Sequence, residues 1–260
     1  MKTDVSVVRL LARWLSIAAV ALMSASCTKA QSGSDYSGFT DVRYYRNSPD
    51  DVVTLKVPNG YIDYDVVGGL PRRDVEYQMF FTAETKTLNP RSKENNQAFE
   101  FPTSLTQKIR FSILSMNRVP SGERHERVQK ILERPFGALM RPCIRGAQPS
   151  KWFGLERYVI DPASCPKIGP TLRDDILIER DGQGNFKTVI ECMPDDVSDS
   201  GEHVREGRIE HYSPQCAQSY FSETLNSHIV INFSRAYRKD WKNLQQRVDA
   251  LLMSFVQPKQ

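Results

Sequence analysis

Two cysteines and two histidines in the C-terminal third of the chain have side chains that could hold a metal ion. Thiolate and imidazole groups are common ligands of zinc, which binds four of them in a tetrahedral site. The four residues are Cys192, His203, His211 and Cys216. Their spacing fits no common zinc module, and the thiols of an exported protein would be oxidised to a disulfide. We therefore favour a disulfide, and we predict neither a metal nor another cofactor.

Other residues with catalytic potential are scattered along the chain. The adjacent acids Asp174-Asp175 and Asp195-Asp196 could act in acid–base catalysis, but paired acids in turns are usually solvated. His211 and Ser213 lie near an acid, as in a hydrolytic triad, yet neither lies in a nucleophile motif. The sequence also lacks the Gly-x-Ser-x-Gly, phosphate-loop, dinucleotide-binding, His-Glu-x-x-His and Cys-x-x-Cys motifs. We therefore predict that the protein is not an enzyme.

The N-terminus has the order of a secretory signal peptide. Basic residues come first, the uncharged stretch 14–23 follows, and small residues precede Cys27. The apolar stretch is shorter than the roughly 18 to 20 residues that span a bilayer. A cysteine after small residues is typical of a bacterial lipobox, so we predict that residues 1–26 are removed and that Cys27 is acylated. Ordinary cleavage that releases a soluble protein is the alternative, because Ser24 stands where a lipobox usually has Leu.

The other four cysteines form an even set, as expected for a protein in an oxidising compartment. They are Cys143, Cys165, Cys192 and Cys216. Four cysteines allow three pairings, and the sequence does not choose among them. Proximity favours Cys143 with Cys165 and Cys192 with Cys216, and each bond would stabilise the fold by about 3 kcal/mol.

Charge and composition argue against a binder of nucleic acids. The formal net charge is +4, and the charged residues of the predicted signal contribute +2 of it, so residues 27–260 carry +2. Basic and acidic residues are interspersed, whereas a nucleic-acid binder needs a basic patch. Residues 27–38 are polar and rich in Ser and Gly, so we predict a flexible tether between the lipid anchor and the folded part.

The first half of the folded part shows alternating and helical patterns. The stretch 53–57 alternates apolar and polar residues as a half-buried strand does. Further strands are predicted from Glu76 and from Gln107, with an exposed polar loop between them. In the stretch 121–137 apolar residues are three and four apart, which predicts a short helix capped by Ser121.

The second half repeats this arrangement and ends in the clearest helix. Residues 175–192 are predicted to form a hairpin around the turn 181–185, and three more strands follow before residue 234. From Trp241 apolar residues recur every three or four positions, which predicts a helix packed on a sheet. We therefore predict an α+β fold with antiparallel sheets each packed by a helix, an arrangement that allows two similar subdomains. The predicted parts are a signal peptide (1–26), a flexible tether (27–38), an N-terminal α+β subdomain (39–140), a cystine-containing connection (141–170) and a C-terminal α+β subdomain (171–260).

Two adjacent aromatic residues in the connection are candidates for binding a partner. Trp152 and Phe153 follow a Pro-Ser-Lys stretch, which is an unusual place to bury two large rings. Exposed aromatic side chains are frequent contributors to protein interfaces. Packing of both rings beneath the loop is the alternative.

Several stretches together resemble one bacterial protein family. The signal peptide, "LKVPNGYIDY" at 55–64 and the segment from "CAQSYF" to "DALLMSF" at 216–255 resemble lipoprotein immunity proteins encoded beside type VI secretion phospholipase effectors. The resemblance implies a protein anchored by its N-terminal lipid to the outer membrane and facing the periplasm. It also implies a partner, a secreted lipase or phospholipase effector, whose catalytic entrance the protein covers.

Two other functions are compatible with the sequence. An envelope scaffold or assembly lipoprotein would bind structural envelope components instead of a toxin. An envelope enzyme of unfamiliar type would gather acids or histidines from distant parts of the chain in one cleft. Inhibition of a secreted phospholipase is the function that the resemblance favours.

Overall fold

The computed structural model describes residues 36–45, 52–63, 78–101, 103–114, 116, 119–134, 150–160, 175–195, 201–205 and 208–258, with the backbone alone for 44, 45, 78, 121, 201–205 and 208–212. Tyr36–Gln260 form one compact unit. Among the described residues, no helix has the length and apolar character needed to cross a membrane. The signal peptide, Cys27 and the pairing of Cys143 with Cys165 lie outside the described residues and stay predictions.

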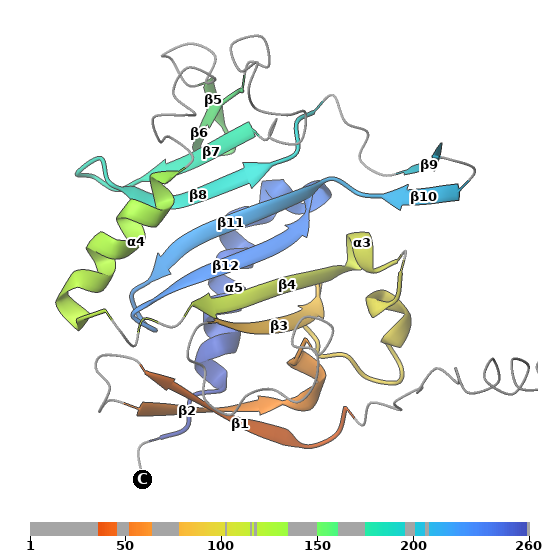
Figure 1. Ribbon diagram of the computed structural model, residues 1–260, viewed down its shortest axis with the longest axis horizontal. Helices are drawn as coiled ribbons and strands as arrows, with labels where there is room; N and C mark the ends of the chain where they lie inside the picture. Colours follow the sequence, from red (N-terminus) through yellow and green to blue (C-terminus); the bar gives the residue numbers. More distant parts are fainter. Residues whose placement is uncertain are drawn as a thin grey trace, which may run out of the picture. The chain divides into compact units, whose positions relative to one another are not determined.

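The described residues form antiparallel strands and a few helices, which is the predicted α+β class (Figure 1). The strands are β1 (Phe39–Tyr45), β2 (Val52–Pro58), β3 (Gln78–Glu84), β4 (Lys108–Leu114), β5 (Ser150–Trp152), β6 (Leu155–Tyr158), β7 (Asp175–Arg180), β8 (Phe186–Cys192), β9 (Gly201–Arg205), β10 (Arg208–Tyr212), β11 (Gln215–Ser222) and β12 (Ser227–Ser234). The helices are α3 (Ser104–Gln107), α4 (Arg124–Leu132) and α5 (Trp241–Ser254), with the 3₁₀ helices η1 (Asn59–Tyr61), η2 (Asn96–Phe99), η3 (Ser121–Glu123) and η7 (Arg235–Asp240).

One antiparallel sheet of eight strands dominates the fold. Its strand order is β3-β4-β12-β11-β8-β7-β6-β5, as Figure 1 shows. Strand β4 from the predicted N-terminal subdomain pairs with β12 from the predicted C-terminal one, and Phe111 lies opposite Ile231. The sheet therefore runs through both predicted subdomains. Two further pairs, β1 with β2 and β9 with β10, form separate hairpins.

Two helices cover opposite faces of this sheet. Ile176 and Ile178 of β7 belong to the same apolar cluster as Val128 of α4, whereas Leu177 belongs to the same cluster as Val248 of α5. Successive residues of a strand point to opposite faces, so α4 and α5 lie on opposite sides of the sheet (Figure 1). The prediction that helices pack on the sheet is confirmed.

The alternation predicted for residues 53–57 is confirmed, but the predicted helix cap at Ser121 is wrong. Val53, Leu55 and Val57 of β2 are buried, as their alternation predicted. The predicted cap Ser121 instead begins the 3₁₀ turn η3. The N-cap of α4 is Glu123, whose side chain makes no capping hydrogen bond.

The loop after β3 packs on the protein, although its polar sequence predicted an exposed loop. Leu88 is buried, and the hydroxyl of Tyr61 donates to the Leu88 carbonyl at 2.9 Å. The amide of Arg91 donates to the Gly60 carbonyl at 2.9 Å. A Cβ atom at Gly60 would lie 2.2 Å from the Arg91 carbonyl oxygen, so only glycine fits beneath this loop.

A histidine, His228, is buried at the start of β12. Within the described part of the chain, neither ring nitrogen of His228 has a hydrogen-bond partner, and the residue is 5% exposed. Burial, followed by the charge of Arg134, lowers the pKa of His228 from 6.5 to about 4. The folded protein therefore favours the neutral imidazole.

We predict that His228 makes the fold less stable in acid. The unfolded chain protonates this histidine near pH 6.5 and the folded protein near pH 4, so the unfolded state binds more protons between these values. The folded protein thus loses about 3 kcal/mol of stability as the pH falls from 6.5 to 4. In His228→Leu, the free energy of unfolding in urea should not show this decrease between pH 7 and pH 4. His125→Gln on the exposed side of α4 should keep it, and equal losses in the two variants would contradict the prediction.

Candidate functional site

The predicted partner-binding residues Trp152 and Phe153 lie at the tip of the β5–β6 hairpin. Trp152 pairs with Leu155, so Phe153 and Gly154 form a two-residue turn in which both φ angles are positive, at 47° and 82°. Hairpin turns of this kind favour Asn-Gly, and the left-handed conformation costs about 1–2 kcal/mol for a residue such as phenylalanine. The side chain of Phe153 is also 41% exposed. The positive φ and the exposed ring make Phe153 a candidate functional residue.

Two guanidinium groups lie close to the Trp152 ring. The central guanidinium carbons of Arg157 and Arg238 lie 5.4 and 4.4 Å from the centre of the Trp152 ring. The ammonium group of Lys239 lies 5.7 Å from the centre of the Phe153 ring. Such cation–π contacts contribute about 0.5 to 2 kcal/mol each, depending on burial. The two aromatic residues therefore differ, because Trp152 is half-buried against cations while Phe153 is exposed.

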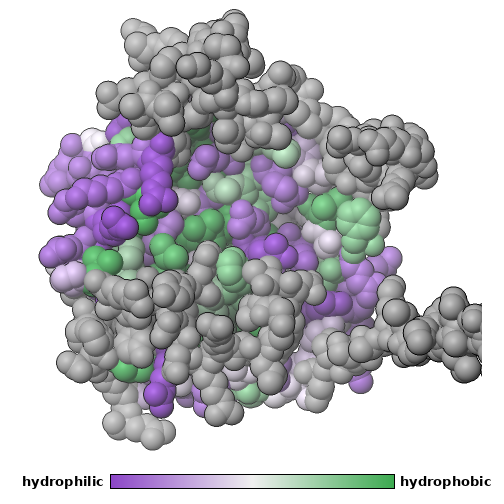
Figure 2. Space-filling view, in the orientation of Figure 1, coloured by the Kyte–Doolittle hydropathy of each residue, from purple (hydrophilic) through white to green (hydrophobic). Residues whose placement is uncertain are grey.

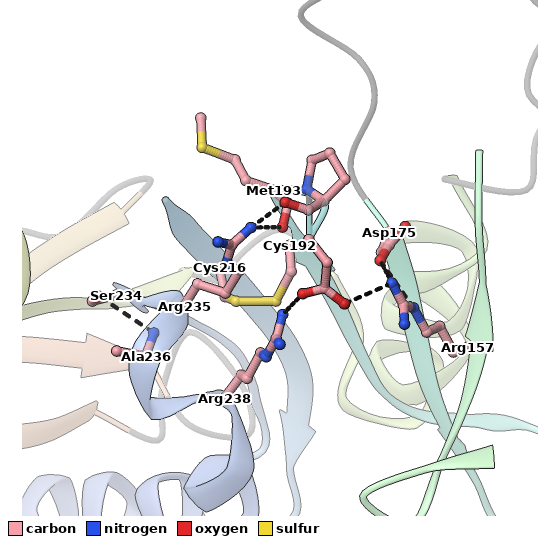
Figure 3. Close-up of polar contacts among 11 residues, drawn as sticks. Arg157, Asp175, Cys192, Met193, Cys216, Ser234, Arg235, Ala236 and Arg238 are labelled. Carbon is pink, nitrogen blue, oxygen red and sulfur yellow. Dashed lines mark hydrogen bonds and ion pairs between the residues drawn. A yellow bond between two sulfur atoms is a disulfide. The ribbon is translucent and has the colours of Figure 1, made fainter. Parts of the chain in front are cut away.

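Asp195 forms hydrogen bonds with both of these arginines. Figure 3 labels Arg157 and Arg238 and marks their polar contacts with dashed lines. The Asp195 carboxylate accepts hydrogen bonds from Nη2 of Arg157 at 3.0 Å and from Nη1 of Arg238. Burial acts in the other direction, but Arg238 and then Arg157 hold the pKa of Asp195 below its ordinary value. The carboxylate of Asp195 is thus ionised and shared between two cations.

Arg157 also pairs with a buried acid, Asp175. Its Nε donates to Asp175 at 2.9 Å, and its Nη2 contacts the same carboxylate oxygen. Asp175 is almost fully buried, and this burial raises its pKa although Arg157 lowers it. The expectation that these paired acids are solvated is therefore wrong for Asp175.

A row of residues spaced by three on η7 and at the start of α5 faces this cluster. Arg235, Arg238 and Trp241 follow the repeat of a 3₁₀ helix, so their side chains lie on one side. Nη1 of the buried Arg235 donates to the carbonyl oxygens of residues 193–194, at 3.1 Å to the first (Figure 3). Nε1 of Trp241 donates to the Phe153 carbonyl oxygen at 3.2 Å. Arg235 of η7 thus holds the segment after β8, and Trp241 at the start of α5 holds the β5–β6 turn.

A cross-strand disulfide fixes the same end of β8. Cys192 and Cys216 are direct partners in the ladder between β8 and β11, and their sulfur atoms are bonded (Figure 3). The predicted pairing of these two cysteines is confirmed, and the bond excludes both thiols as zinc ligands. The side chains of His203 and His211 lie outside the described part. Within that part, no group of three or more His, Cys, Asp or Glu residues could hold a metal ion.

Exposed apolar side chains adjoin this cluster. On the face seen in Figure 2, hydrophobic areas are interrupted by hydrophilic ones. Phe153 and Met193 are 41% and 43% exposed, and their carbonyl oxygens accept the hydrogen bonds from Trp241 and Arg235. The structure thus combines apolar and charged groups in one place, which we call the arginine–tryptophan surface. It consists of Trp152, Phe153, Arg157, Met193, Asp195 and Arg238.

A cavity of about 260 Å³ lies elsewhere, beside α5 and the turn after β3. Its lining residues are Thr85, Lys86, Tyr237, Asp240, Asn243, Leu244 and Arg247. Nη2 of Arg247 donates to the Lys86 carbonyl at 2.7 Å, and the Thr85 hydroxyl donates to the Thr106 carbonyl at 3.4 Å. Among these described lining residues there is neither a cysteine nor a histidine.

The arginines of this surface were not among the residues predicted from the sequence. The spacing of Arg235, Arg238 and Trp241 was an available signal, because it places three large side chains on one side of a 3₁₀ helix. That signal does not identify the acids that the arginines meet. Arg157, Asp175 and Asp195 come from three separate stretches of the chain, and only the strand order of the sheet brings them together.

A comparison with solved structures identifies a protein of similar fold. Smlt3025, described as an immunity protein of the Stenotrophomonas maltophilia type IV secretion system, superposes with a TM-score of 0.58. The match covers 85% of this chain and 94% of that chain, at 18% sequence identity. No protein-family model and no curated protein sequence matches the chain. The likeness shows that the two proteins share a fold.

The first prediction for this site concerns the strained turn. Replacing Phe153 removes the exposed ring in every variant, but asparagine tolerates a positive φ and a β-branched residue does not. Phe153→Asn should therefore be about 1 to 2 kcal/mol more stable than Phe153→Val in urea unfolding. Equal stability of the two variants would show that the turn does not hold residue 153 in the left-handed conformation.

The second prediction concerns the disulfide. Cys192 and Cys216 are 24 residues apart, so their bond should stabilise the fold by about 3 kcal/mol by restricting the unfolded chain. The double variant Cys192→Ala with Cys216→Ala should lose this stability in urea unfolding under non-reducing conditions. Because Asp195 follows the fixed strand end, the fluorescence of Trp152 should change as well. An unfolding midpoint equal to that of the wild type would contradict the prediction.

Proposed function

We propose that this protein is an immunity protein that binds a secreted bacterial effector and blocks it. The observation that carries the proposal is the fold shared with Smlt3025, a protein described as an immunity protein, over most of both chains. The resemblance of residues 55–64 and 216–255 to immunity lipoproteins supports the same class of function. The two lines of support name different secretion systems, type IV and type VI, and an immunity function is common to both.

The arginine–tryptophan surface is the proposed contact with the effector. Tryptophan and arginine are enriched among the residues that carry most of the binding energy of interfaces. Arg235 and the disulfide hold the end of β8, and Trp241 holds the β5–β6 turn. A surface held in this way needs little reordering when it binds, which favours high affinity. Inhibition would be steric and stoichiometric.

The finer proposal concerns the effector and the place of action. Following the sequence resemblance, we propose that the effector is a phospholipase delivered by a type VI system. The protein would face the periplasm and be anchored to the outer membrane through an acylated Cys27. Covering the catalytic entrance of a lipase requires neither a catalytic residue nor a cofactor in this chain. Anchoring would raise the local concentration of inhibitor at the membrane that a phospholipase attacks.

The direct test is purification of the tagged protein from its own cells, with mass spectrometry of the bound partners and of the mature N-terminus. We expect one secreted effector in stoichiometric amount, and an acylated Cys27 as the first residue. A phospholipase would support the finer proposal, and another toxin would support the general one alone. Recovery with structural envelope components and no toxin would refute an immunity function.

A variant pair tests the contact surface. Trp152→Ala with Phe153→Ala should weaken effector binding by about 2 to 4 kcal/mol, or roughly 30-fold to 1,000-fold in Kd, because central aromatic residues carry much of the binding energy. Phe39→Ala with Phe101→Ala removes two aromatic residues that are 60% and 66% exposed elsewhere, and this control should bind normally. Isothermal titration with the purified effector measures both. Normal binding by the first pair would exclude the hairpin as the contact.

A further inference from the structure

We propose that the arginine–tryptophan surface is a carboxylate-binding site that Asp195 fills in the free protein, and that an acidic side chain of the effector takes the place of Asp195. This inference rests on the proposed immunity function and specifies the chemistry of the partner. The partner would present an acidic residue flanked by apolar ones. Asp195 would then act as an internal competitor for the site.

Asp195 lies outermost in the cluster. Its side chain is 43% exposed, whereas those of Arg157 and Arg238 are 20% and 21% exposed. Each oxygen of its carboxylate meets a different arginine, since Oδ2 accepts from Arg157 and Oδ1 from Arg238. An incoming carboxylate would therefore approach from the solvent side and meet the same two donors.

Other contacts hold the two arginines when Asp195 moves away. Arg157 keeps its hydrogen bonds to the buried Asp175, through Nε at 2.9 Å and through Nη2. Arg238 keeps its place 4.4 Å from the Trp152 ring. Within the described ranges, the one carboxylate paired with Arg238 is that of Asp195. Displacement thus exposes a guanidinium group already oriented on an aromatic ring, which suits it to bind a carboxylate through two parallel hydrogen bonds.

The surroundings favour an acidic protein segment as the partner. Lys239 lies over the Phe153 ring, so a third cation stands beside the two arginines. Among the described residues, the ion pair that remains in this group without Asp195 is that of Arg157 with the buried Asp175. The exposed side chains of Phe153 and Met193 offer apolar contacts to the residues next to an incoming acid. Complementary charge of this kind sets specificity and speeds association.

The test uses the full chain and a fluorescein-labelled hexaglutamate peptide, with fluorescence anisotropy as the readout at low salt. Asp195→Asn keeps the shape of the side chain and removes its charge, so the variant should bind the peptide at least about tenfold more tightly than the wild type, because an internal competitor acts at a high effective concentration. Adding Arg238→Gln to this variant should abolish the gain. Asp195→Ala is a second variant with the same expected gain.

The matched control is Glu223→Gln. Glu223 is an exposed acid in the turn between β11 and β12, so this variant changes the net charge equally and should leave peptide binding unchanged. An equal gain in Glu223→Gln, or tighter binding of inorganic phosphate than of the peptide by Asp195→Asn, would overturn the proposal.

Unchanged peptide binding by variants at residue 195 that keep the wild-type circular dichroism spectrum would also overturn it. Capture of the effector by the wild-type protein, measured in parallel, reports on the proposed function alone. A wild type that captures its effector while the variants at residue 195 show no gain would refute only this inference.

Discussion

The pairing of β12 with both β4 and β11 is the constraint on which the rest of the fold depends. Ile231 of this strand lies between Phe111 on β4 and Gln218 on β11, so segments more than a hundred residues apart in the chain share one sheet. The helix η7 follows β12 directly, and the hydroxyl of Ser234 at the end of the strand accepts the Ala236 amide at 3.4 Å. The sheet therefore sets the place where the arginines of η7 begin. The side chains that η7 carries are therefore anchored to the core of the protein.

A row of polar contacts between the sheet and α5 fixes the other end of η7. Gln245 of α5 accepts hydrogen bonds from Gln218 at 2.7 Å and from Thr188 at 3.2 Å. One turn further along the helix, Asp249 accepts a hydrogen bond from the hydroxyl of Tyr220 at 3.0 Å. Burial raises the pKa of both Tyr220 and Asp249, so both groups favour their protonated forms more than in water. These bonds form only when α5 has one orientation about its axis and one position along it. They therefore also fix the position of Trp241 at the start of the helix.

The parts of the fold that follow local periodicity could be predicted from the sequence. The terminal helix, the alternation of β2 and the hairpin of β7 and β8 each depend on neighbours within one element. The bond between Cys192 and Cys216 could be proposed because the two residues are near in the chain. The pairing of β4 with β12 could not, since the register between distant strands depends on which residues both faces of the finished sheet bury. The ion pairs of the site depend on this strand order, so the sequence indicated two aromatic residues and missed the charges around them.

The charged groups of the arginine–tryptophan surface are already paired within the protein, and this would limit which partners the proposed contact surface accepts. A solvated pair is worth little, but Arg157, Arg238 and Asp195 are partly withdrawn from water, so a partner must match their geometry to replace a bond that already exists. A partner with a misplaced carboxylate would gain less binding energy than is lost when the bonds between Asp195 and the arginines break. Internal pairing of this kind lowers affinity for every partner and lowers it most for the wrong ones, which is how repulsive or competing contacts produce specificity. Such discrimination would suit the proposed immunity function, in which one effector must be recognised among other acidic proteins.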